Sequence, residues 1–344
     1  MVVINKNGKK LSIILVLVLC LASFVGCSKE KVEKNPSDSH KIKETIVFAD
    51  PGWDTTSYFN DIARFIIENG YGYKTDTKNG SDAILFSALR SGDIDLHMEI
   101  WKHGYEPYKE AAKIGDVIEV GIIHSDAVQG YYVPTFVIKG DPERGIKPMA
   151  PDLKSVKDLA KYSSLFQDIE DKNKGRIYSS PVGWLADEIT HAKVEAYGLD
   201  KTFNVFNPGS QSALEISLSK ACEQGKPWVG YYWEPTWIAG KYDLTLLEDE
   251  TYSEDVYKEG KCAYPNEDVI IVGHKSFSKK APEIYEFLKK FQLSGALVSK
   301  ALAYMQDNKA SSDDTAVKFL KENEDMWIQW VPQDVAEKVK AAIK

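Results

Sequence analysis

Residues 175–199, GRIYSSPVGWLADEITHAKVEAYGL, place a strand, a turn and a helix in direct succession. The first four residues favour a short β-strand, and Pro181 and Gly183 then favour a turn. From Leu185 onwards apolar residues recur at helical spacing, and the pattern ends at Gly198, a residue type common where helices end. We therefore expect a strand that continues through a Gly-Trp pair directly into an α-helix.

A second stretch, IVFADPGWDTT at 46–56, has the same order of apolar strand, proline, Gly-Trp and helix start. Strands and helices alternate along the rest of the chain, which favours an open α/β sheet. We expect strands at 45–50, 93–101, 130–140, 175–184, 227–237 and 268–277, helices at 55–70, 82–92, 155–166, 185–199 and 211–225, and a mostly helical C-terminus. In two lobes of similar construction, each Gly-Trp lies at the carboxyl end of a strand, where open α/β sheets bind ligands.

The N-terminus has the parts of a bacterial export signal. Three lysines precede an apolar run at 11–25, LSIILVLVLCLASFV, whose 15 residues are fewer than the about 20 that a membrane-spanning helix needs. Cys27 follows and resembles the cysteine of a lipoprotein signal, which becomes the acylated first residue, although Phe24 stands where that pattern prefers Leu. The alternative is an uncleaved N-terminal anchor. In both cases the rest of the chain lies outside the cytoplasmic membrane.

Residues 28–44, SKEKVEKNPSDSHKIKE, are polar and favour a flexible tether. The chain from Cys27 onwards has 318 residues and a formal net charge of −11, which argues against nucleic-acid binding. Its length indicates two domains or lobes. Cys222 and Cys262 either pair or stay free, because two cysteines do not make a disulfide framework.

Four tryptophans lie at or near the expected ends of strands: Trp53, Trp101, Trp184 and Trp233. One such residue is more often a core filler. Four of them in one chain favour a shared cleft with aromatic walls. A quaternary ammonium group suits such walls, because it has no N–H to donate and is attracted by the negative faces of π systems.

Several segments resemble the glycine betaine/proline betaine substrate-binding proteins of ABC importers. They are LRSGDIDLHMEIW at 89–101, AVQGYY at 127–132, SPVGWLADEITHAKVEAYGLD at 180–200 and EQGKPWVGYYWEPTW at 223–237. They occur in the family's order, and the resemblance covers about residues 45–330. It implies a two-lobed α/β fold of the type II periplasmic-binding-protein kind, with the ligand cleft between the lobes. Related binding proteins use the same frame for choline, carnitine and other betaines.

The resemblance also implies roles for individual residues. Trp101, Trp184 and Trp233 match the three tryptophans that surround the trimethylammonium group. The backbone N–H groups of Leu185 and Ala186 match those that hold the carboxylate of the betaine. A helix start suits that role, because its N–H groups are unpaired and its dipole end is positive.

The sequence departs from the family's pattern at two positions. Tyr105 stands where a family member has a histidine that binds the carboxylate, and Thr236 replaces a histidine in the motif that begins at Trp233. Glu99 shares strand parity with Trp101, so it is a further candidate for the cleft. A buried carboxylate there favours a cation and disfavours a second negative group. These changes favour choline-like or bulkier cations.

The roles of two further residues stay open. Glu234 faces either the cleft or solvent, and His103 is either a substitute for the missing histidine or a surface residue.

An enzyme is the main rival class. The segment HMEIWKH at 97–103 contains two histidines and a glutamate, but no second motif supports a metal site. A purely structural surface lipoprotein does not account for the aromatic pattern. We expect a binding protein without catalysis, cofactor or metal, whose partners are a permease, an ATPase and the membrane through Cys27.

The expected domains are a signal peptide at 1–26, a tether at 27–44, lobe 1 at 45–138 plus 268–344, and lobe 2 at 139–267. Two crossings join the lobes, the first near residues 136–142 and the second near 262–270. Ligand binding closes the lobes by a hinge motion.

Overall fold

The computed structural model describes residues 43–343. The predicted signal peptide, Cys27 and nearly all of the predicted tether lie outside the described residues. Within the described part, no helix is long and apolar enough to cross a membrane.

The described strands form a mixed nine-stranded sheet with the order β2-β1-β3-β9-β4-β7-β5-β6, and β8 pairs with β4. The strands are β1 Ile46–Asp50, β2 Thr75–Asn79, β3 Leu96–Trp101, β4 Val117–Pro134, β5 Gly175–Tyr178, β6 Phe203–Phe206, β7 Gly230–Glu234, β8 Leu244–Leu246 and β9 Glu267–His274. We call β2, β1, β3 and β9 the first half-sheet, and β7, β5, β6 and β8 the second half-sheet. The neighbouring pairs β1–β2, β1–β3, β5–β6 and β5–β7 are parallel, as a strand–helix–strand alternation predicts.

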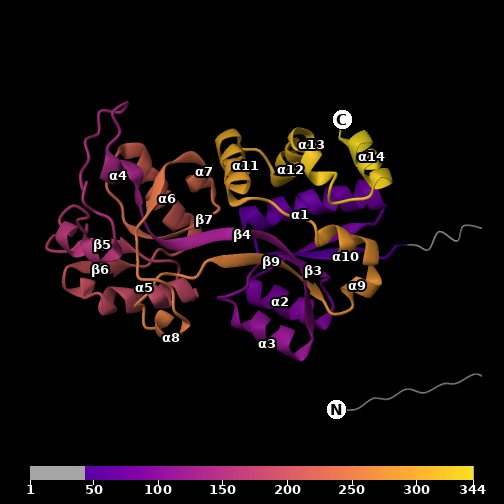
Figure 1. Cartoon of the computed structure of the whole chain (residues 1–344), viewed down its shortest axis with the longest axis horizontal. Helices are drawn as coiled ribbons and strands as arrows, with labels where there is room; N and C mark the ends of the chain where they lie inside the picture. The colour runs from indigo at the N-terminus through magenta and orange to yellow at the C-terminus, as the bar shows by residue number, and fades with distance from the viewer. Residues whose placement is uncertain (1–42, 344) are drawn as a thin grey trace, which may run out of the picture. The chain divides into compact units, whose positions relative to one another are not determined.

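The strand β4 belongs to both half-sheets (Figure 1). It pairs with β9 up to Ala127, which faces Glu267, and with β7 from Val128, which faces Glu234. This change of partner precedes residues 136–142, where the sequence predicts the first crossing. The sequence also predicts a strand at 130–140, whereas β4 ends at Pro134, and Thr135–Lys139 form the short helix α4. A proline lacks the N–H of a ladder hydrogen bond, which explains why the strand stops there. The predicted lobe limits stay a prediction.

α-Helices occupy the ranges predicted from apolar spacing and helix-end residues, except at 155–166. They are α1 Asp54–Ile66, α2 Asp82–Ser91, α3 Glu106–Ile114, α4 Thr135–Lys139, α5 Leu185–Ala196, α6 Gln211–Gln224, α7 Trp237–Lys241, α8 Glu254–Tyr257, α9 Phe277–Lys280, α10 Pro282–Leu288, α11 Gly295–Asn308, α12 Ser312–Glu322, α13 Glu324–Trp327 and α14 Gln333–Ala342. A π-helical turn, Ile67–Tyr71, follows α1, and Leu199–Lys201 is a 3₁₀ turn after α5.

Besides the strand predicted at 130–140, two further predicted elements differ from the structure. The predicted helix at 155–166 is only a 3₁₀ turn at Val156–Tyr162, with a capping box between Ser155 and Asp158. The predicted strand at 227–237 contains the short β7 and the start of α7. Thr236 ends the extended segment, because its Oγ accepts a hydrogen bond from the backbone N–H of Ala239 and caps α7.

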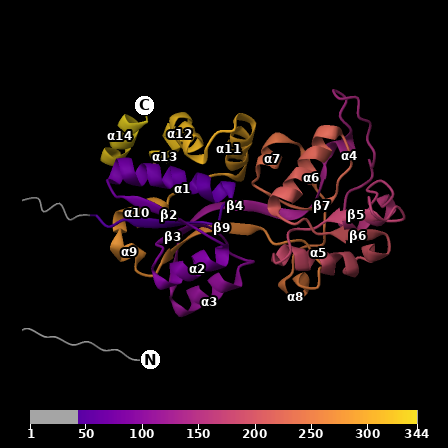
Figure 2. The ribbon, with the colours of Figure 1, turned by 180° about the vertical axis from the view of Figure 1, so that it is seen from behind.

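Helices cover both faces of the sheet (Figures 1 and 2). On the first half-sheet, α1, α11 and α12 lie on one face, and α2 and α3 lie on the other. On the second half-sheet, α6 and α7 lie on one face and α5 on the other. The two groups of helices meet where α7 packs against α11.

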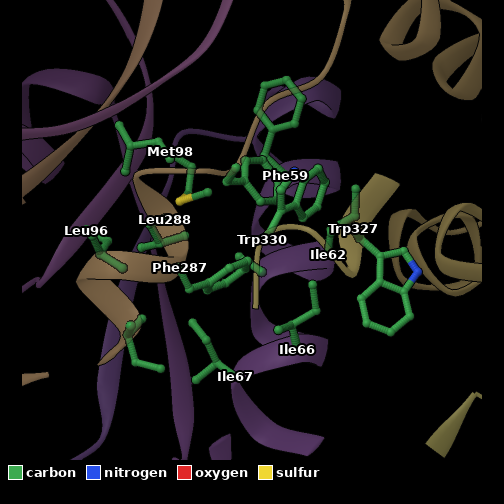
Figure 3. Close-up of a cluster of buried hydrophobic side chains, with 14 of the residues drawn as sticks. Phe59, Ile62, Ile66, Ile67, Leu96, Met98, Phe287, Leu288, Trp327 and Trp330 are labelled. Atoms are coloured by element: carbon green, nitrogen blue, oxygen red, sulfur yellow. The ribbon is translucent and has the colours of Figure 1, made fainter. Parts of the chain in front are cut away.

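The core of the first half-sheet has one hydrophobic cluster on each face. Ile271 of β9 contributes to the cluster under α1, and its neighbours Ile270 and Val272 contribute to the one under α2. This alternation is the two-residue period of a strand that is buried on both sides. Figure 3 shows the larger cluster, with side chains from α1, β3, α10 and the C-terminal helices: Phe59, Ile62, Ile66, Ile67, Leu96, Met98, Phe287, Leu288, Trp327 and Trp330. This core fixes the position of β3, which ends at Trp101.

Candidate functional site

The two Gly-Trp pairs have the same backbone conformation. Gly52 and Gly183 have φ angles of +83° and +96°, in the region that glycine adopts without strain. Trp53 follows with φ −90° and ψ 136°, and Trp184 with φ −85° and ψ 143°. Each tryptophan is the N-cap residue of a helix, α1 or α5. The similarity of the two segments in sequence therefore extends to their structure.

The start of α5 offers unpaired backbone N–H groups. Leu185 and Ala186 are the first two residues of the helix, and no side chain caps it. The first N–H groups of a helix lack partners within the helix and attract negative charge. The acid Asp187 in this first turn accepts a hydrogen bond of 2.7 Å from the hydroxyl of Ser179 and one from Asn207. The carboxylate of Asp187 is thus held by Ser179 and Asn207.

Three of the predicted tryptophans meet in one aromatic cluster. The rings of Trp184 and Trp233 have centroids 5.4 Å apart and planes at 64°. Trp101 packs against the same cluster, to which Leu185 and Ala186 also belong. Trp101 comes from the end of β3, Trp184 from the turn before α5, and Trp233 from β7. Trp184 and Trp233 therefore contact each other, and Trp101 packs against the cluster that contains them; we call these three indoles the aromatic box.

Tyrosines of β7 and of the loop before β9 support the box. Tyr231 is stacked on Trp233 at 5.9 Å and 29°, and its hydroxyl donates a hydrogen bond of 2.8 Å to Gln129. Tyr264 contacts Tyr231 at 5.4 Å and donates to the backbone carbonyl of Ala186. Burial raises the pKa of Tyr231 and of Tyr264 well above the usual value, so both phenols stay neutral.

Glu99 is buried below Trp101. The hydroxyls of Thr55 and Thr56 each donate a hydrogen bond of 2.6 Å to its Oε2. The indole Nε1 of Trp101 donates one of 3.2 Å to its Oε1. Burial raises the pKa of Glu99, and these donors together with the nearby His97 oppose the rise. The carboxylate therefore connects the box to the first turn of α1.

Trp53 lies next to this network without belonging to the aromatic cluster in the described structure. It is half-buried at the start of α1, directly before Asp54, Thr55 and Thr56. Its backbone carbonyl accepts the first helical hydrogen bond, from Ser57. Its predicted role in ligand binding stays a prediction.

Tyr105 occupies a different environment from the one that the resemblance implies. Its ring packs edge-on against Phe86 at 5.1 Å, in the cluster that lies under α2. Its hydroxyl is buried beside the carboxylate of Asp82, without hydrogen-bond geometry. Burial and this carboxylate raise the pKa of Tyr105. The structure thus places Tyr105 with the helix α2 rather than with Trp184 and Trp233, and its contact with a ligand stays a prediction.

His103 links the loop after Trp101 to the α8 region and to β9. Its Nε2 lies 2.9 Å from Oε2 of Glu254, and it also contacts the hydroxyl of Tyr252. Its backbone N–H donates a hydrogen bond of 2.7 Å to Glu267, which is buried. Glu267 therefore holds the loop, and His103 contacts residues of the α8 region.

The segment YYWEPTW at 231–237 divides its residues between the box and its support. Trp233 belongs to the box, whereas Trp237 donates a hydrogen bond of 3.1 Å from Nε1 to Glu215. Thr236 caps α7, and its N–H donates to Ser299 of α11. Glu234 is half-buried, and burial raises the pKa of its carboxyl group.

Sequence reasoning missed Thr55, Thr56 and Glu267. The two threonines follow Gly52-Trp53 closely in the sequence. The similarity between the two Gly-Trp segments could therefore have indicated that Thr55 and Thr56 lie near the site. Glu267 carries no local signal, because it contacts His103 only through the tertiary fold. Cys222 and Cys262 are both buried and free. Within residues 43–343, no group of three or more His, Cys, Asp or Glu side chains is arranged to hold a metal ion.

Comparison with known proteins identifies the family. Residues 44–322 match the family described as the substrate binding domain of ABC-type glycine betaine transport systems. The chain belongs to this family. The match covers most of the chain, including all three tryptophans of the box, and it confirms the resemblance seen in the sequence.

Individual relatives agree with this assignment. The trimethylamine N-oxide-binding protein of Pelagibacter ubique is 25% identical over 324 residues, which are 93% of this chain and 98% of that protein. The glycine betaine/proline betaine-binding periplasmic protein of Escherichia coli is 23% identical over 268 residues, 73% of this chain and 78% of that protein. Both are named as binding proteins, and the second as periplasmic.

A solved structure has the same fold. The lactococcal OpuAC in its closed-liganded conformation with glycine betaine has a TM-score of 0.64 at 18% identity, over 84% of this chain and 100% of that chain. The fold is therefore the two-lobed α/β fold of periplasmic substrate-binding proteins, as the sequence predicts. The chain is a substrate-binding protein of ABC-type transport.

Proposed function

We propose that this protein binds a quaternary ammonium compound, such as glycine betaine or proline betaine, in the aromatic box and delivers it to an ABC permease. The supporting observation is the contact between Trp184 and Trp233, 5.4 Å apart at 64°, with Trp101 in the same cluster. Inclined indole faces from separate elements suit a rounded cation that donates no hydrogen bond.

The polar end of the ligand faces the start of α5 in this proposal. The N–H groups of Leu185 and Ala186 bind a carboxylate or another electron-rich group there. Choline, carnitine and other betaines are alternative ligands of the same frame. Trimethylamine N-oxide, named in the relative from Pelagibacter ubique, has the same methylated nitrogen with an oxygen in place of the carboxymethyl group.

Delivery requires partners and a place at the membrane. The predicted signal peptide and Cys27 support a lipoprotein that is anchored outside the cytoplasmic membrane. Closure of two lobes around the ligand follows from the hinge motion of periplasmic binding proteins. The strands β4 and β9 are candidates for the crossings, because β4 pairs with both half-sheets and meets the end of β9 at Ala127. The permease and ATPase subunits then use the closed form, and the bound ligand undergoes no chemistry.

Calorimetric titration with glycine betaine, proline betaine, carnitine, choline and trimethylamine N-oxide tests the ligand class. We expect saturable binding of at least one of these compounds. Binding of none of them would contradict the proposal that the box receives a quaternary ammonium group.

Two alanine variants test the box itself. A cation–π contact contributes about 0.5–2 kcal/mol, and tenfold in affinity corresponds to about 1.4 kcal/mol. Because Trp184→Ala or Trp233→Ala removes a whole wall of the box, we expect a loss of at least about tenfold in affinity. The matched control is Trp228→Phe, since Trp228 is buried in the same cluster but is stacked on Tyr178. Equal losses in the control and in the box variants would indicate a packing role for all three tryptophans.

A further inference from the structure

Tyr231 is contacted from both of the proposed crossings. Its hydroxyl donates a hydrogen bond of 2.8 Å to the side chain of Gln129, which lies on β4 just after this strand changes its partner. Its ring lies 5.4 Å from the ring of Tyr264, in the segment that leads into β9. The same ring is stacked on Trp233 of the box at 5.9 Å and 29°. One side chain therefore connects both crossings to one wall of the box.

The pairing of β4 with β7 determines how Gln129 reaches Tyr231. Gln129 lies opposite Trp233, and Tyr131 lies opposite Tyr231. Because side chains alternate along a strand, Gln129 and Tyr231 project from the same face of the sheet as diagonal neighbours. The side chain of Tyr231 is buried, and a buried hydroxyl needs a hydrogen-bond partner. The Oε1 of Gln129 therefore fixes the position of this ring.

A cavity of about 230 Å³ separates the two crossings. It is lined by residues 128–131 and 246–249 and by three residues of the segment before β9. The edge of β4 that faces away from β7 pairs with β9 as far as Ala127 and with β8 from Tyr132 onwards. In the described part of the chain, no strand pairs with that edge between these two residues. Strand pairing therefore does not hold the crossings together here, and the cavity leaves them room to move against each other.

Tyr264 also reaches the other part of the candidate site. Its hydroxyl donates a hydrogen bond of 3.3 Å to the backbone carbonyl of Ala186, in the first turn of α5. The segment before β9 therefore contacts α5 directly, and it contacts Trp233 through Tyr231. A displacement of this segment would reach both the N–H groups and the aromatic wall that the proposed function assigns to the ligand.

We propose that Tyr231 is a positioning residue that couples the two crossings to the aromatic box. As the lobes close, Gln129 and Tyr264 move with the crossings and carry the ring of Tyr231, which in turn carries Trp233. Closure and completion of the box are then a single event, and a ligand held in the box opposes the reverse motion of the crossings. This inference rests on the proposed function and names the contact through which the hinge acts on the ligand.

Hydrogen–deuterium exchange of the full chain, followed by mass spectrometry, measures this coupling in the crossings themselves. The ligand is the compound of the titration panel that binds the wild type most tightly. We expect it to slow amide exchange at 127–131 and 262–266 at least about tenfold in the wild type. At concentrations that saturate each variant, we expect this slowing to fall below about threefold in Tyr231→Phe and in Gln129→Leu. A side chain that only stabilises the fold would leave the slowing at saturation unchanged.

Two further variants sharpen the comparison. Tyr232→Phe is the matched control, because it removes a buried hydroxyl that has no hydrogen-bond partner among the described residues, and we expect it to keep the wild-type slowing. The double variant of Tyr231→Phe and Gln129→Leu removes one shared interaction. We therefore expect it to bind the ligand no more weakly than the weaker single variant, because the two changes are not additive.

The outcomes separate the coupling from the proposed function. Wild-type slowing in Tyr231→Phe and Gln129→Leu would overturn the coupling and leave the ligand site intact, and so would an equal loss of slowing in Tyr232→Phe. No binding of any panel compound to the wild type would overturn the proposed function. The coupling is then tested without ligand: we expect Tyr231→Phe to exchange at least about threefold faster than Tyr232→Phe at both crossings, and equal rates would overturn it.

Discussion

His124 makes the folded protein sensitive to acid. Its ring is buried in β4, 6.3 Å from the ring of Phe59, and its Nδ1 lies 3.4 Å from Asp126 without hydrogen-bond geometry. Burial lowers the pKa of His124 from 6.5 to about 4, and the charge of Asp126 opposes this only in part. The folded state therefore holds a neutral imidazole, whereas the unfolded chain takes up a proton below pH 6.5.

The sign and size of the effect follow from this pKa difference. Since the unfolded state binds more protons between pH 6.5 and 4, the free energy of unfolding falls as the pH falls through that range. One pKa unit corresponds to 1.36 kcal/mol, so the full loss is about 3 kcal/mol and the loss at pH 5 is about 2 kcal/mol. At roughly 2–4 °C per kcal/mol, the midpoint of thermal unfolding falls by several degrees at pH 5.

Thermal unfolding followed by circular dichroism between pH 4 and 8 measures this effect. Carboxyl groups also titrate in this range, so the useful quantity is the difference between the wild type and His124→Asn at each pH. We expect the wild type to lose about 2 kcal/mol relative to the variant between pH 8 and pH 5. Parallel curves for the two proteins would refute the reasoning, because the variant lacks the titrating group.

Three further substitutions test the packing and the anchor. Lys193→Met removes the cation that lies 2.5 Å from the buried carboxylate of Asp249. We expect the free energy of unfolding, measured by chemical denaturation, to fall by about 3–5 kcal/mol. The control is Lys157→Met, which breaks the exposed pair with Glu250 and is expected to change the free energy of unfolding by less than about 1 kcal/mol. Gly240→Ala places a methyl group 2.1 Å from the carbonyl oxygen of Ser299. We expect this overpacking to lower the free energy of unfolding by about 1–3 kcal/mol, measured by thermal unfolding. A change below about 0.5 kcal/mol would contradict the close approach of α7 and α11. Cys27→Ser is expected to abolish the incorporation of labelled palmitate in cells, and labelling that persists in this variant would argue against the lipoprotein signal.

Local sequence signals were sufficient where neighbouring residues determine the structure. Gly92 and Gly225 end α2 and α6 in the left-handed conformation, as their positions predict. The strand and turn before Trp184 also formed as expected, because the turn residues and the helix start are adjacent in the chain. The meeting of Trp101, Trp184 and Trp233 was predicted from the family resemblance rather than from local signals.

Tertiary contacts determined the parts that sequence reasoning missed. The strand β4 contains Glu119, His124 and Asp126, which interrupt an apolar pattern, yet pairing with β9 holds this segment extended. Tyr105 was proposed from the family resemblance, which says nothing of the packing of its ring on Phe86 of α2. The network of Glu99 likewise depends on the approach of α1 to β3.

The position of β9 between β3 and β4 determines when the first half-sheet can be completed during synthesis. The ladder partners of β9 are strands that leave the ribosome much earlier, and β3 and β4 flank it on opposite sides. The strands β5, β6, β7 and β8, in contrast, have all been made before β9 appears. The half-sheet that contains the N-terminal strands therefore finishes last, and the interior of the chain can pair first. This order leaves Trp101 and the acid beneath it without their final neighbours until residues 267–274 have been made.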